Sequence, residues 1–345
     1  MQVRRLILII LFMSLAGCSR AIKIPPTEIP TATPILLPTP FLPAETKATA
    51  PNGQTLPSPT PWVFPTPYWD NTTINWPYGI PTMAIPVEET FEGPVKVYVL
   101  LGSDWMPHRD HDLTDAVMLV LVNTETDSAT VISIARDLYV FIPGFGWGRI
   151  NQPWALGGFD TVKETIRYNF GLEVDGVVYA RIYAVENFID NGLGHLFVQV
   201  SEPIIERCGD LVIDLIPGEV FMDGEYAMCY ARSRMMTSDF SRMVRQQEIL
   251  SAMKKRFFER AMNHPVALGE DLYAAFVLSG IKTDIQILDV PGLVEIAVDV
   301  KDDIDFALIA PPLVEHFDHP ESGAWLLQMP TPKKTYEFFI GLLDE

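Results

Sequence analysis

Four arginines gather in the stretch YARSRMMTSDFSRMVRQQ (230–247) of a chain whose formal net charge is -19. They are Arg232, Arg234, Arg242 and Arg245. Guanidinium groups bind phosphate oxygens through two parallel hydrogen bonds, which lysine cannot do. The cluster therefore predicts a phosphate site. The alternative is a solvated face with internal Arg–Asp pairs.

The spacing of these residues suggests how they would meet. If YARSR ends a strand, Arg232 and Arg234 point to one face, because side chains alternate along a strand. If a helix begins near Asp239, then Asp239, Arg242 and Gln246 share one helical face. A strand that ends in two arginines would then be followed by a helix with Asp239, Arg242 and Gln246 on one face.

Further charged residues follow or precede apolar runs. Arg136 comes directly after ATVISIA, Asp104 after VYVLLGS, and Asp115 just before AVMLVLVN. In open α/β sheets, ligands lie beyond the carboxyl ends of the strands. Two carboxylates with water and phosphate oxygens are typical of Mg²⁺ sites. Converging arginines and carboxylates predict phosphoryl-transfer chemistry, whereas each aspartate alone would cap a loop.

The loop MPHRDHDLTD (106–115) also contains two histidines and two more aspartates. They are His108, Asp110, His111 and Asp112. Read alone, this composition suggests a transition-metal site. A solvated loop is the preferred interpretation, because the spacing is no recognised ligand pattern.

Strands and helices alternate along the part of the chain that carries these residues. Strands are expected at 95–102, 116–123 and 129–135, and helices at 159–170 and 243–262. MDGEYAMCYARSR is expected to be a short helix leading into a strand. The alternation predicts an α/β domain in which helices cover a sheet. A further helix is expected around 290–300, and another near the end of the chain.

The beginning of the chain is typical of an exported protein. Arg4 and Arg5 precede the apolar run 6–15, which is shorter than the roughly 20 residues of a membrane span. LAGC resembles the lipobox of bacterial lipoproteins, which implies cleavage before Cys18 and lipidation of Cys18. The alternative is an ordinary signal peptide with a chance cysteine.

Composition then divides the chain into four parts. A signal peptide is expected over 1–18, a Pro/Thr-rich extended linker over 19–92, a globular domain over 93–262, and a helical extension packed on it over 263–345. Two cysteines besides Cys18 remain, Cys208 and Cys229. In an oxidising compartment they form a disulfide or stay as two buried thiols.

Several blocks occur in the order seen in the LytR-CpsA-Psr (LCP) family. They are VYVLLGSD, TDAVMLV, ISIARDLYVFIPGFGWGRIN, the glycine pair at 157–158, GEYAMCYARSR and DFSRMVRQQ. The resemblance covers about 95–258. It implies a three-layer α-β-α sandwich with a central mixed sheet and a polyprenyl pocket between the sheet and helices. It also implies Mg²⁺-dependent transfer of a glycopolymer from a polyprenyl-diphosphate carrier onto peptidoglycan.

The resemblance assigns roles to individual residues. Asp104 and Asp115 correspond to the Mg²⁺-associated carboxylates. The phosphate-binding and polar positions correspond to Arg136, Arg232, Arg234, Asp239, Arg242 and Gln246. Arg149 and Asn151 match a further substrate-binding block. Where family members commonly have an arginine, this chain has Leu113, and Arg109 is the candidate replacement.

The expected partners are a polyprenyl-diphosphate-linked glycan, a peptidoglycan acceptor and the membrane, through the lipid anchor. The acidic balance argues against a nucleic-acid partner, since such binding needs a broad basic surface. The expected location is the extracytoplasmic face of the bacterial cell membrane.

Residues considered for an apolar tunnel are 117–122, Phe188, Ile189, Ile249, Leu250, Phe257 and Phe258, with ordinary core packing as the alternative. Two other functions stay open: a non-catalytic carrier-binding lipoprotein, and a polyprenyl-diphosphate pyrophosphatase.

Overall fold

The structure is a computed structural model. It describes residues 83–87, 94–104, 112–233, 239–264, 267–269, 271, 280–286, 288–319, 322–329 and 331–344. Cys18, Arg109 and Arg234 lie outside these residues.

A mixed sheet of six strands forms the centre of this described part, in the order β11-β6-β1-β2-β3-β12. The strands are β1 (Val95–Ser103), β2 (Ala116–Asn123), β3 (Ser128–Ile134), β6 (Gly176–Arg181), β11 (Lys282–Thr283) and β12 (Ile304–Ile309). β6 runs parallel to β1 and β12 parallel to β3, while the other neighbours are antiparallel. The carboxyl ends of β1, β3, β6 and β12 therefore meet at one edge of the sheet.

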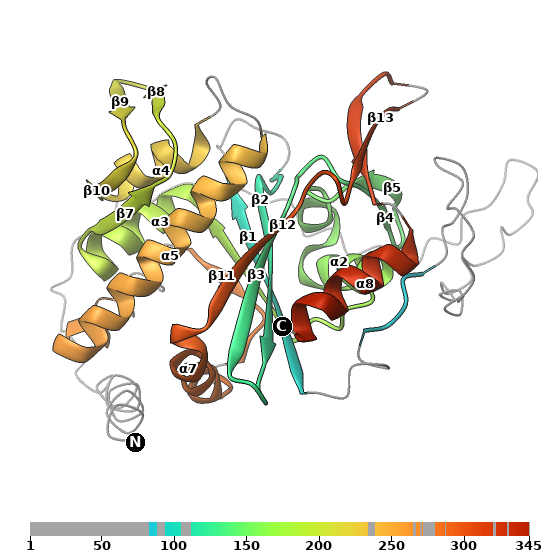
Figure 1. Cartoon of the computed structure of the whole chain (residues 1–345), viewed down its shortest axis with the longest axis horizontal. Helices are drawn as coiled ribbons and strands as arrows, with labels where there is room; N and C mark the ends of the chain where they lie inside the picture. The colour runs from blue at the N-terminus through green and yellow to red at the C-terminus, as the bar shows by residue number, and fades with distance from the viewer. Residues whose placement is uncertain are drawn as a thin grey trace, which may run out of the picture. The chain divides into compact units, whose positions relative to one another are not determined.

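Helices cover both faces of this sheet (Figure 1). One face carries α2 (Pro153–Phe170) and α8 (Pro332–Asp344), and the other carries α3 (Ile182–Asn187), α4 (Gly224–Arg232) and α5 (Asp239–Asn263). The π-helical turn η1 (Phe188–Leu193) continues α3, and α7 (Val290–Asp299) continues into the short 3₁₀ helix η2 (Val300–Asp302). The expected three-layer α-β-α sandwich with a mixed sheet is confirmed.

One apolar cluster packs the sheet against α2 and α8, and another packs the elements of the opposite helical layer together. Val99, Leu119 and Ile132 are fully buried in the cluster shared with α2 and α8. Leu196 and Ile213 belong to a second cluster around α3, α4 and α5. The central strands read as near-continuous apolar runs because helices bury both of their faces.

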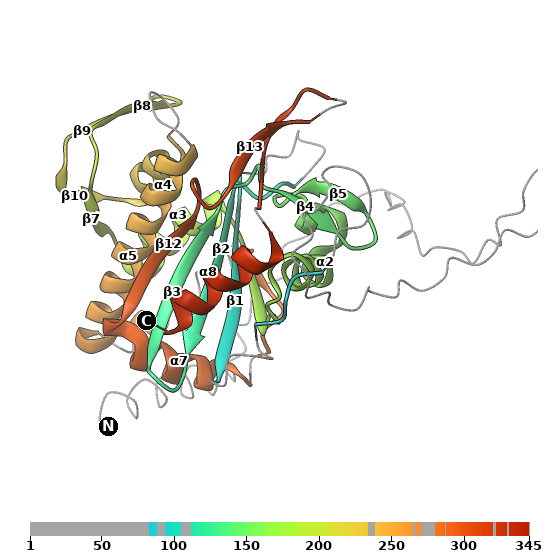
Figure 2. The ribbon, with the colours of Figure 1, turned by 45° about the vertical axis from the view of Figure 1, so that its right-hand side comes forward.

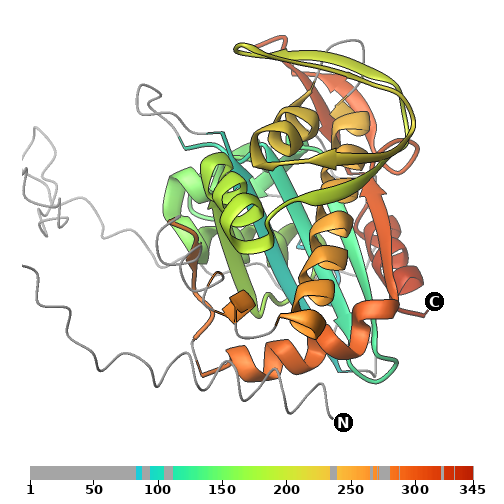
Figure 3. The ribbon, with the colours of Figure 1, turned by 90° about the vertical axis from the view of Figure 1, so that its left-hand side faces the viewer.

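Short hairpins and strand pairs flank the sheet. They are β4–β5 (Tyr139–Ile142, Gly146–Arg149), β13–β14 (Glu315–Asp318, Trp325–Gln328), β7–β10 (Leu196–Val200, Gly218–Met222) and β8–β9 (Ile204–Cys208, Leu211–Leu215). The β13–β14 hairpin projects from the sheet (Figure 2), and β7–β10 curve around α4 (Figure 3).

Two expectations about secondary structure were wrong. YARSR does not end a strand, because α4 continues to Arg232 and Ser233 caps it. The part from 263 onward is not only helical, since β12 forms an edge of the central sheet and β13–β14 a hairpin. In both places local composition suits either conformation, and packing decides between them.

The globular unit also starts earlier than residue 93. Met83, Ala84, Ile85 and Val87 are buried. Ala84 N donates to the carbonyl of Tyr168, and Val87 N donates to that of Gly171. The end of the proline-rich segment is thus packed against the last turn of α2.

Gly171 makes this packing possible, and we expect Gly171→Ala to be strongly destabilising. Gly171 has φ +70°, and a Cβ there would lie 1.9 Å from the carbonyl oxygen of Ile85. The left-handed backbone alone costs a non-glycine residue about 1–2 kcal/mol, and the clash adds to it. The free energy of unfolding, measured with urea, should fall by more than about 3 kcal/mol.

Gly323→Ala is the matched control. Gly323 has φ +64°, but a Cβ there would meet no atom within 4 Å. The Gly323→Ala variant should therefore lose only the free energy of unfolding that the left-handed backbone costs, about 1–2 kcal/mol. Equal losses in the two variants would contradict the packing of 83–87 on α2.

Of the helices in the described part of the chain, none combines the length and apolar character needed to span a bilayer.

Candidate functional site

The sheet edge at which β1, β3 and β6 end brings the predicted charged residues together. Asp104 follows β1, Asp115 precedes β2, and Arg136 lies two residues after β3. Arg136 Nη1 donates a 2.6 Å hydrogen bond to Asp115 Oδ1. The sequence-based expectation that these strand ends converge is confirmed for these residues.

The two aspartates lie close enough to interact. Burial on its own raises the pKa of Asp115. The hydrogen bond and charge of Arg136 more than offset this, aided by a hydrogen bond with the Asp104 side chain and by the charge of Arg242, and hold the pKa below its ordinary value. Two carboxyl groups in contact repel each other when both are ionised, unless a proton or a cation lies between them.

Arg136 is the centre of a wider ion-pair network. Its Nε lies 3.5 Å from Asp137 Oδ2 and 3.3 Å from Asp239 Oδ2, in addition to the contact with Asp115. Asp239 is the first residue of α5. Arg136 therefore connects the end of β3 to the start of β2 and to α5.

Arg242 joins the same group from the first turn of α5. Its side chain is buried, its Nη1 lies 3.6 Å from Asp239 Oδ1, and its Nη2 donates to the backbone carbonyl of Asp115 at 3.5 Å. A buried guanidinium group needs acceptors around it. The site therefore holds two arginines, Arg136 and Arg242, in one cluster of carboxylates.

Arg149 is linked to this cluster through Asp137. Arg149 Nε lies 3.3 Å from Asp137 Oδ1, and the Arg149 side chain is 41% exposed. Arg149 ends β5, so the β4–β5 hairpin reaches the edge of the site.

Asn151 contributes its backbone to the loop before β2. Thr114 donates to the Asn151 carbonyl oxygen through both its backbone N and its side-chain Oγ1. The Asn151 side chain is buried, and its Oδ1 accepts no hydrogen bond. Asn151 thus fixes the residue preceding Asp115.

A cavity of about 980 Å³ opens beside these residues, between the sheet and helices α3, α4 and α5. Its polar lining includes Asp104, Asp115, Arg232, Arg242 and Gln246. Most of the remaining lining is apolar, which suits a ligand with a charged end and an apolar body.

The cavity floor is graded in side-chain size. Gly102 pairs with Ala116 on β2 and with Ala180 on β6, and all three line the cavity next to the carboxylates. Two residues farther from the site, the corresponding row is Met118, Leu100 and Val178. The floor is therefore open near the charges and tighter farther away.

The predicted apolar lining is confirmed in part. Phe188, Ile249, Leu250 and, within 117–122, Met118 line the cavity. Ile189 and Phe257 pack in the core cluster around α5 instead, and Phe258 stacks edge-on against Phe257.

Arg232 lines the cavity from the last residue of α4. Burial raises the pKa of the neighbouring Glu186, and the charge of Arg232 opposes this shift. Arg232 therefore lies beside an acidic part of the cavity wall. Arg232 does not lie on a strand, because α4 includes it, and Arg234 lies outside the described residues.

Arg245, the fourth arginine of the cluster noted in the sequence, is structural. It is buried, and its Nη2 donates a 2.7 Å hydrogen bond to the Ser233 carbonyl at the end of α4. Gln247 is also structural: its amide donates to Ser133 Oγ and to the Ala307 carbonyl. These contacts hold α5 against α4, β3 and β12.

Sequence reasoning missed a second polar network near Asp115. Asp112 accepts hydrogen bonds from Ser103 Oγ, from the Tyr179 hydroxyl and from Arg181 Nη2. Burial raises the pKa of Asp112, but these three donors hold it below its ordinary value. Asp112 was expected in a solvated loop, but it ties the residues before β2 to the ends of β1 and β6.

No sequence signal marked this network. Tyr179 and Asp112 are 67 residues apart in the chain. Val178 and Ala180 line the cavity, so Tyr179 and Arg181 point to the opposite face of the sheet. The network therefore braces the ends of β1 and β6 from the face of the sheet opposite to the cavity.

Within the described residues, no group of three or more His, Cys, Asp or Glu side chains is placed to hold a metal ion. The Asp104–Asp115 pair is therefore the acidic group to consider. Mg²⁺ is commonly held by one or two carboxylates together with water and substrate phosphate, and the oxygen donors of this pair fit that preference.

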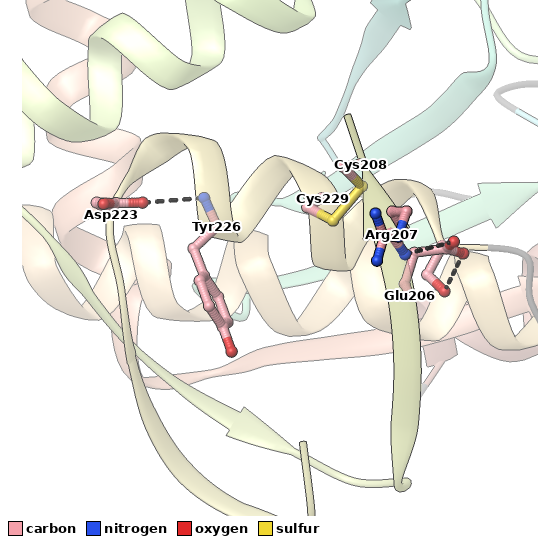
Figure 4. Close-up of a disulfide and its surroundings, with 7 residues drawn as sticks. Glu206, Arg207, Cys208, Asp223, Tyr226 and Cys229 are labelled. Atoms are coloured by element: carbon pink, nitrogen blue, oxygen red, sulfur yellow. Dashed lines mark hydrogen bonds between the residues drawn. A yellow bond between two sulfur atoms is a disulfide. The ribbon is translucent and has the colours of Figure 1, made fainter. Parts of the chain in front are cut away.

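The wall of the cavity contains a disulfide between Cys208 on β8 and Cys229 on α4 (Figure 4). This confirms the disulfide alternative over two buried thiols. The bond joins the β8–β9 hairpin to α4 and closes a loop with a sequence separation of 21 residues.

We expect the double variant Cys208→Ser/Cys229→Ser to lower the free energy of unfolding by about 3 kcal/mol, because a cross-link limits the unfolded chain. Urea unfolding with and without a reductant is the measurement. Reductant should lower the midpoint of the wild type and leave that of the double variant unchanged. An unchanged wild-type midpoint would contradict the contribution of the bond.

Comparisons with known proteins agree with this geometry. The model of the LytR_cpsA_psr family matches residues 85–326. The polyisoprenyl-teichoic acid–peptidoglycan teichoic acid transferase TagT of Bacillus subtilis is 34% identical over 149 residues, which cover 42% of this chain and 46% of TagT. The regulatory protein MsrR of Staphylococcus aureus is 28% identical over 172 residues, which cover 48% of this chain and 51% of MsrR.

Among solved structures, B. subtilis TagV has a similar fold, with a TM-score of 0.60 and 22% identity over 73% of this chain and 98% of TagV. The chain spans about half the length of the curated relatives described above.

Proposed function

Because the chain belongs to the LytR_cpsA_psr family, we propose that it is a phosphotransferase that moves a glycopolymer from a polyprenyl-diphosphate carrier to peptidoglycan. The observation that carries this proposal is the position of the Asp115–Arg136–Arg242 cluster at the end of an apolar cavity of about 980 Å³. The similarity to TagT, whose name specifies a polyisoprenyl-linked teichoic acid and peptidoglycan, supports it.

The apolar part of the cavity accommodates the polyprenyl chain. Leu100, Met118, Val178 and Leu250 supply apolar lining from the floor and from α5. Burial of apolar surface contributes about 25 cal/mol per Å². A long isoprenoid chain therefore gains much of its affinity there, and the small residues near the carboxylates leave room for its phosphates.

The diphosphate lies at the charged end of the cavity. Arg242 and Arg232 line this end and bind its oxygens, and Arg136 adjoins it through its hydrogen bond to the lining residue Asp115. Arg109 and Arg234 are assigned to the same role by family resemblance. Arginines held in place by carboxylates before the substrate arrives need little reorganisation, which favours stabilisation of charge in the transition state.

Asp104 and Asp115 are the residues that would hold Mg²⁺. The two carboxyl groups contact each other at the end of the cavity. This arrangement suits Mg²⁺, because a cation between two carboxylates removes their repulsion. When bound, Mg²⁺ neutralises negative charge on diphosphate oxygens. Arg136 keeps Asp115 ionised by lowering its pKa, so this carboxylate is available as a ligand at neutral pH.

The transfer step joins an acceptor hydroxyl oxygen to the phosphorus that carries the glycan. The bond from this phosphorus to the oxygen of polyprenyl phosphate breaks, and polyprenyl phosphate leaves with the electron pair. The hydroxyl proton passes to a carboxylate. Asp239 contacts Arg136 and Arg242, and Asp115 is paired with Arg136, which fits positioning roles, so Asp104 is the preferred acceptor of the proton.

A second candidate function is binding of the carrier without turnover. Leu113 occupies a position where the family resemblance leads one to expect arginine, and it is 36% exposed. An exposed leucine supplies no donor for a phosphate. A carrier-binding envelope protein would keep the cavity and lose the transfer step.

The lipid-anchored form of the protein is part of the proposal. Lipidation of Cys18 would place the domain at the extracytoplasmic face of the cell membrane, where both donor and acceptor occur. Mass spectrometry of the mature N-terminal peptide tests this: an unmodified Cys18, or cleavage elsewhere, would contradict the anchor.

One assay separates the functions. The purified full-length protein in detergent is incubated with a polyprenyl-diphosphate-linked glycan and Mg²⁺, with and without soluble peptidoglycan fragments. Release of polyprenyl phosphate together with a glycan–peptidoglycan product supports the proposed transferase. Hydrolysis without transfer identifies a pyrophosphatase, and binding without turnover identifies a carrier-binding protein. Either of these two results would overturn the proposal.

A further inference from the structure

Two hairpins meet behind the charged cluster, on the face of the sheet opposite to the cavity. β4–β5 and β13–β14 lie on the α2 side of the sheet, whereas α4, α5 and β8–β9 lie on the other side (Figure 1). The backbone of Asp137 joins both hairpins to the site: Leu327 N on β14 donates to the Asp137 carbonyl at 3.1 Å. The same Asp137 pairs through its carboxylate with Arg136 and Arg149.

A row of side chains leads away from Asp137 along one face of β4–β5. Tyr139 pairs directly with Arg149, and Phe141 with Trp147. Directly opposed residues of an antiparallel pair share a face, as do residues two apart. Arg149, Tyr139 and Trp147 are therefore neighbours on the same face, and Arg149 is the one next to the charged cluster.

The aromatic rings of the two hairpins form one continuous surface. Tyr139 stacks on Trp147, with ring centroids 5.4 Å apart and an interplanar angle of 15°. Phe317 of β13 lies 5.7 Å from Tyr139, and His319 packs edge-on against it at 5.6 Å. The Tyr139 hydroxyl and His319 Nε2 are 3.2 Å apart. Trp147, Phe317 and His319 stay partly exposed.

This row, named here the aromatic row, consists of Tyr139, Trp147, Phe317 and His319. Its rings are fixed by contacts with one another. Tyr139 is buried beneath the others, and the partly exposed Trp147, Phe317 and His319 offer flat apolar faces beside polar edges. Aromatic side chains combine a large contact area with polar groups at the rim. Pyranose rings have the complementary chemistry, with an apolar C–H face and hydroxyl groups around the edge.

The direction of the transfer step decides which sugar would lie there. In phosphoryl transfer, the attacking and leaving oxygens lie roughly in line on opposite sides of the phosphorus. The leaving polyprenyl phosphate belongs to the cavity side of the sheet. The attacking hydroxyl must then arrive from the other side, where the aromatic row begins at Arg149.

We infer that the aromatic row binds the glycan strand of the acceptor peptidoglycan and guides its hydroxyl group to the site. The inference rests on the proposed function, and it assigns the acceptor a surface separate from the donor cavity. Arg149 lies between the row and the charged cluster, close to the position of the attacking oxygen.

The test measures glycan binding directly. Short soluble glycan strands of uncrosslinked peptidoglycan are titrated into the full-length protein, and the dissociation constant is compared among variants. Trp147→Ala and Phe317→Ala should each weaken binding about tenfold. Trp147→Phe should recover most of the affinity, because it keeps a ring. In the transfer assay, KM for the acceptor should rise by a similar factor while kcat and carrier affinity stay within about twofold.

Trp325→Ala is the matched control. Trp325 is 53% exposed on the same β13–β14 hairpin, but the strand register places it on the face opposite to Phe317. Glycan binding should not change. Equal loss in Trp325→Ala and Trp147→Ala would overturn the inference, as would unchanged binding in Trp147→Ala and Phe317→Ala.

Two further outcomes separate this inference from the proposed function. Loss of carrier binding in Trp147→Ala, with acceptor binding intact, would assign the row to the donor glycan and overturn the inference. If the wild type binds the strands through the row but transfers nothing, the inference stands and the proposed transferase fails. If Trp147→Ala and Phe317→Ala both transfer normally with an unchanged KM for the acceptor, the proposed transferase stands and the inference about the aromatic row fails.

Discussion

Replacement of Asp115 by asparagine is expected to reduce the rate of glycopolymer transfer by about 10³-fold, while the chain still folds. Asparagine keeps the shape of the side chain but removes the negative charge that pairs with Arg136 at 2.6 Å. In the proposed site it also removes one of two Mg²⁺ ligands. Loss of several kcal/mol of charge stabilisation corresponds to this factor.

Stability against pH provides a second readout for Asp115→Asn. The pKa of Asp115 in the folded state lies below its ordinary value of 3.8, because Arg136 outweighs the effect of burial. Its stabilising contribution is therefore complete above the unfolded-state pKa and is lost as the pH falls through the lower folded-state pKa. Wild-type stability should fall more steeply than that of the variant in this acidic range.

Asp127→Asn is the matched control for both measurements. Asp127 is exposed in the turn between β2 and β3, at the other end of β2 from Asp115, with φ +55°. Asparagine tolerates this conformation well. The control should transfer at the wild-type rate, and full activity in Asp115→Asn would remove this carboxylate from the site.

The second large effect is expected for Arg136→Lys, which should slow transfer about 10²–10³-fold. The charge is kept, but a lysine ammonium group lacks the planar fork of donors that arginine offers. Arg136 contacts Asp115, Asp137 and Asp239 at the same time, and a single ammonium group cannot reproduce these contacts and also bind a diphosphate with two parallel bonds.

Carrier binding and transfer should both be measured for Arg136→Lys. Weaker binding of the polyprenyl diphosphate together with a lower kcat is the expected pattern. Arg167→Lys is the control, because Arg167 is as little exposed as Arg136 and pairs with Glu164 on α2, outside the charged cluster. If Arg136→Lys keeps its rate, the role of a fixed guanidinium group at the end of β3 is disproved.

The parts of the fold that could be predicted are those encoded locally. The run AVMLVLVN forms β2 with the predicted bounds Ala116–Asn123, since apolar, β-branched residues suit a strand buried on both faces. α5 covers the helix predicted over 243–262 and begins at Asp239, as the shared face of Asp239, Arg242 and Gln246 requires. The strand ends then place Asp104, Asp115 and Arg136 together, because topology brings them to one edge of the sheet.

The parts that could not be predicted depend on distant contacts. Residues 230–232 continue α4 because Met228, Cys229 and Tyr230 are all buried in the core around α5, and short apolar runs are ambiguous between helix and strand. The role of Asp112 depends on partners on β1 and β6. The proline-rich composition around residues 83–87 predicted an extended linker. These residues pack against the domain because the last turn of α2 accepts them, which composition does not reveal.

The strands contributed by the last part of the chain have a consequence for the order of events during folding. β12 completes the sheet beside β3, and Tyr139 meets His319 across a separation of 180 residues. Contacts of such long range form slowly, because a large loop must close before they are gained. A chain synthesised in sequence order makes Asp115 and Arg136 available first and the strand that braces β3 much later. The six-stranded sheet therefore cannot be complete until residues 304–309 have been made.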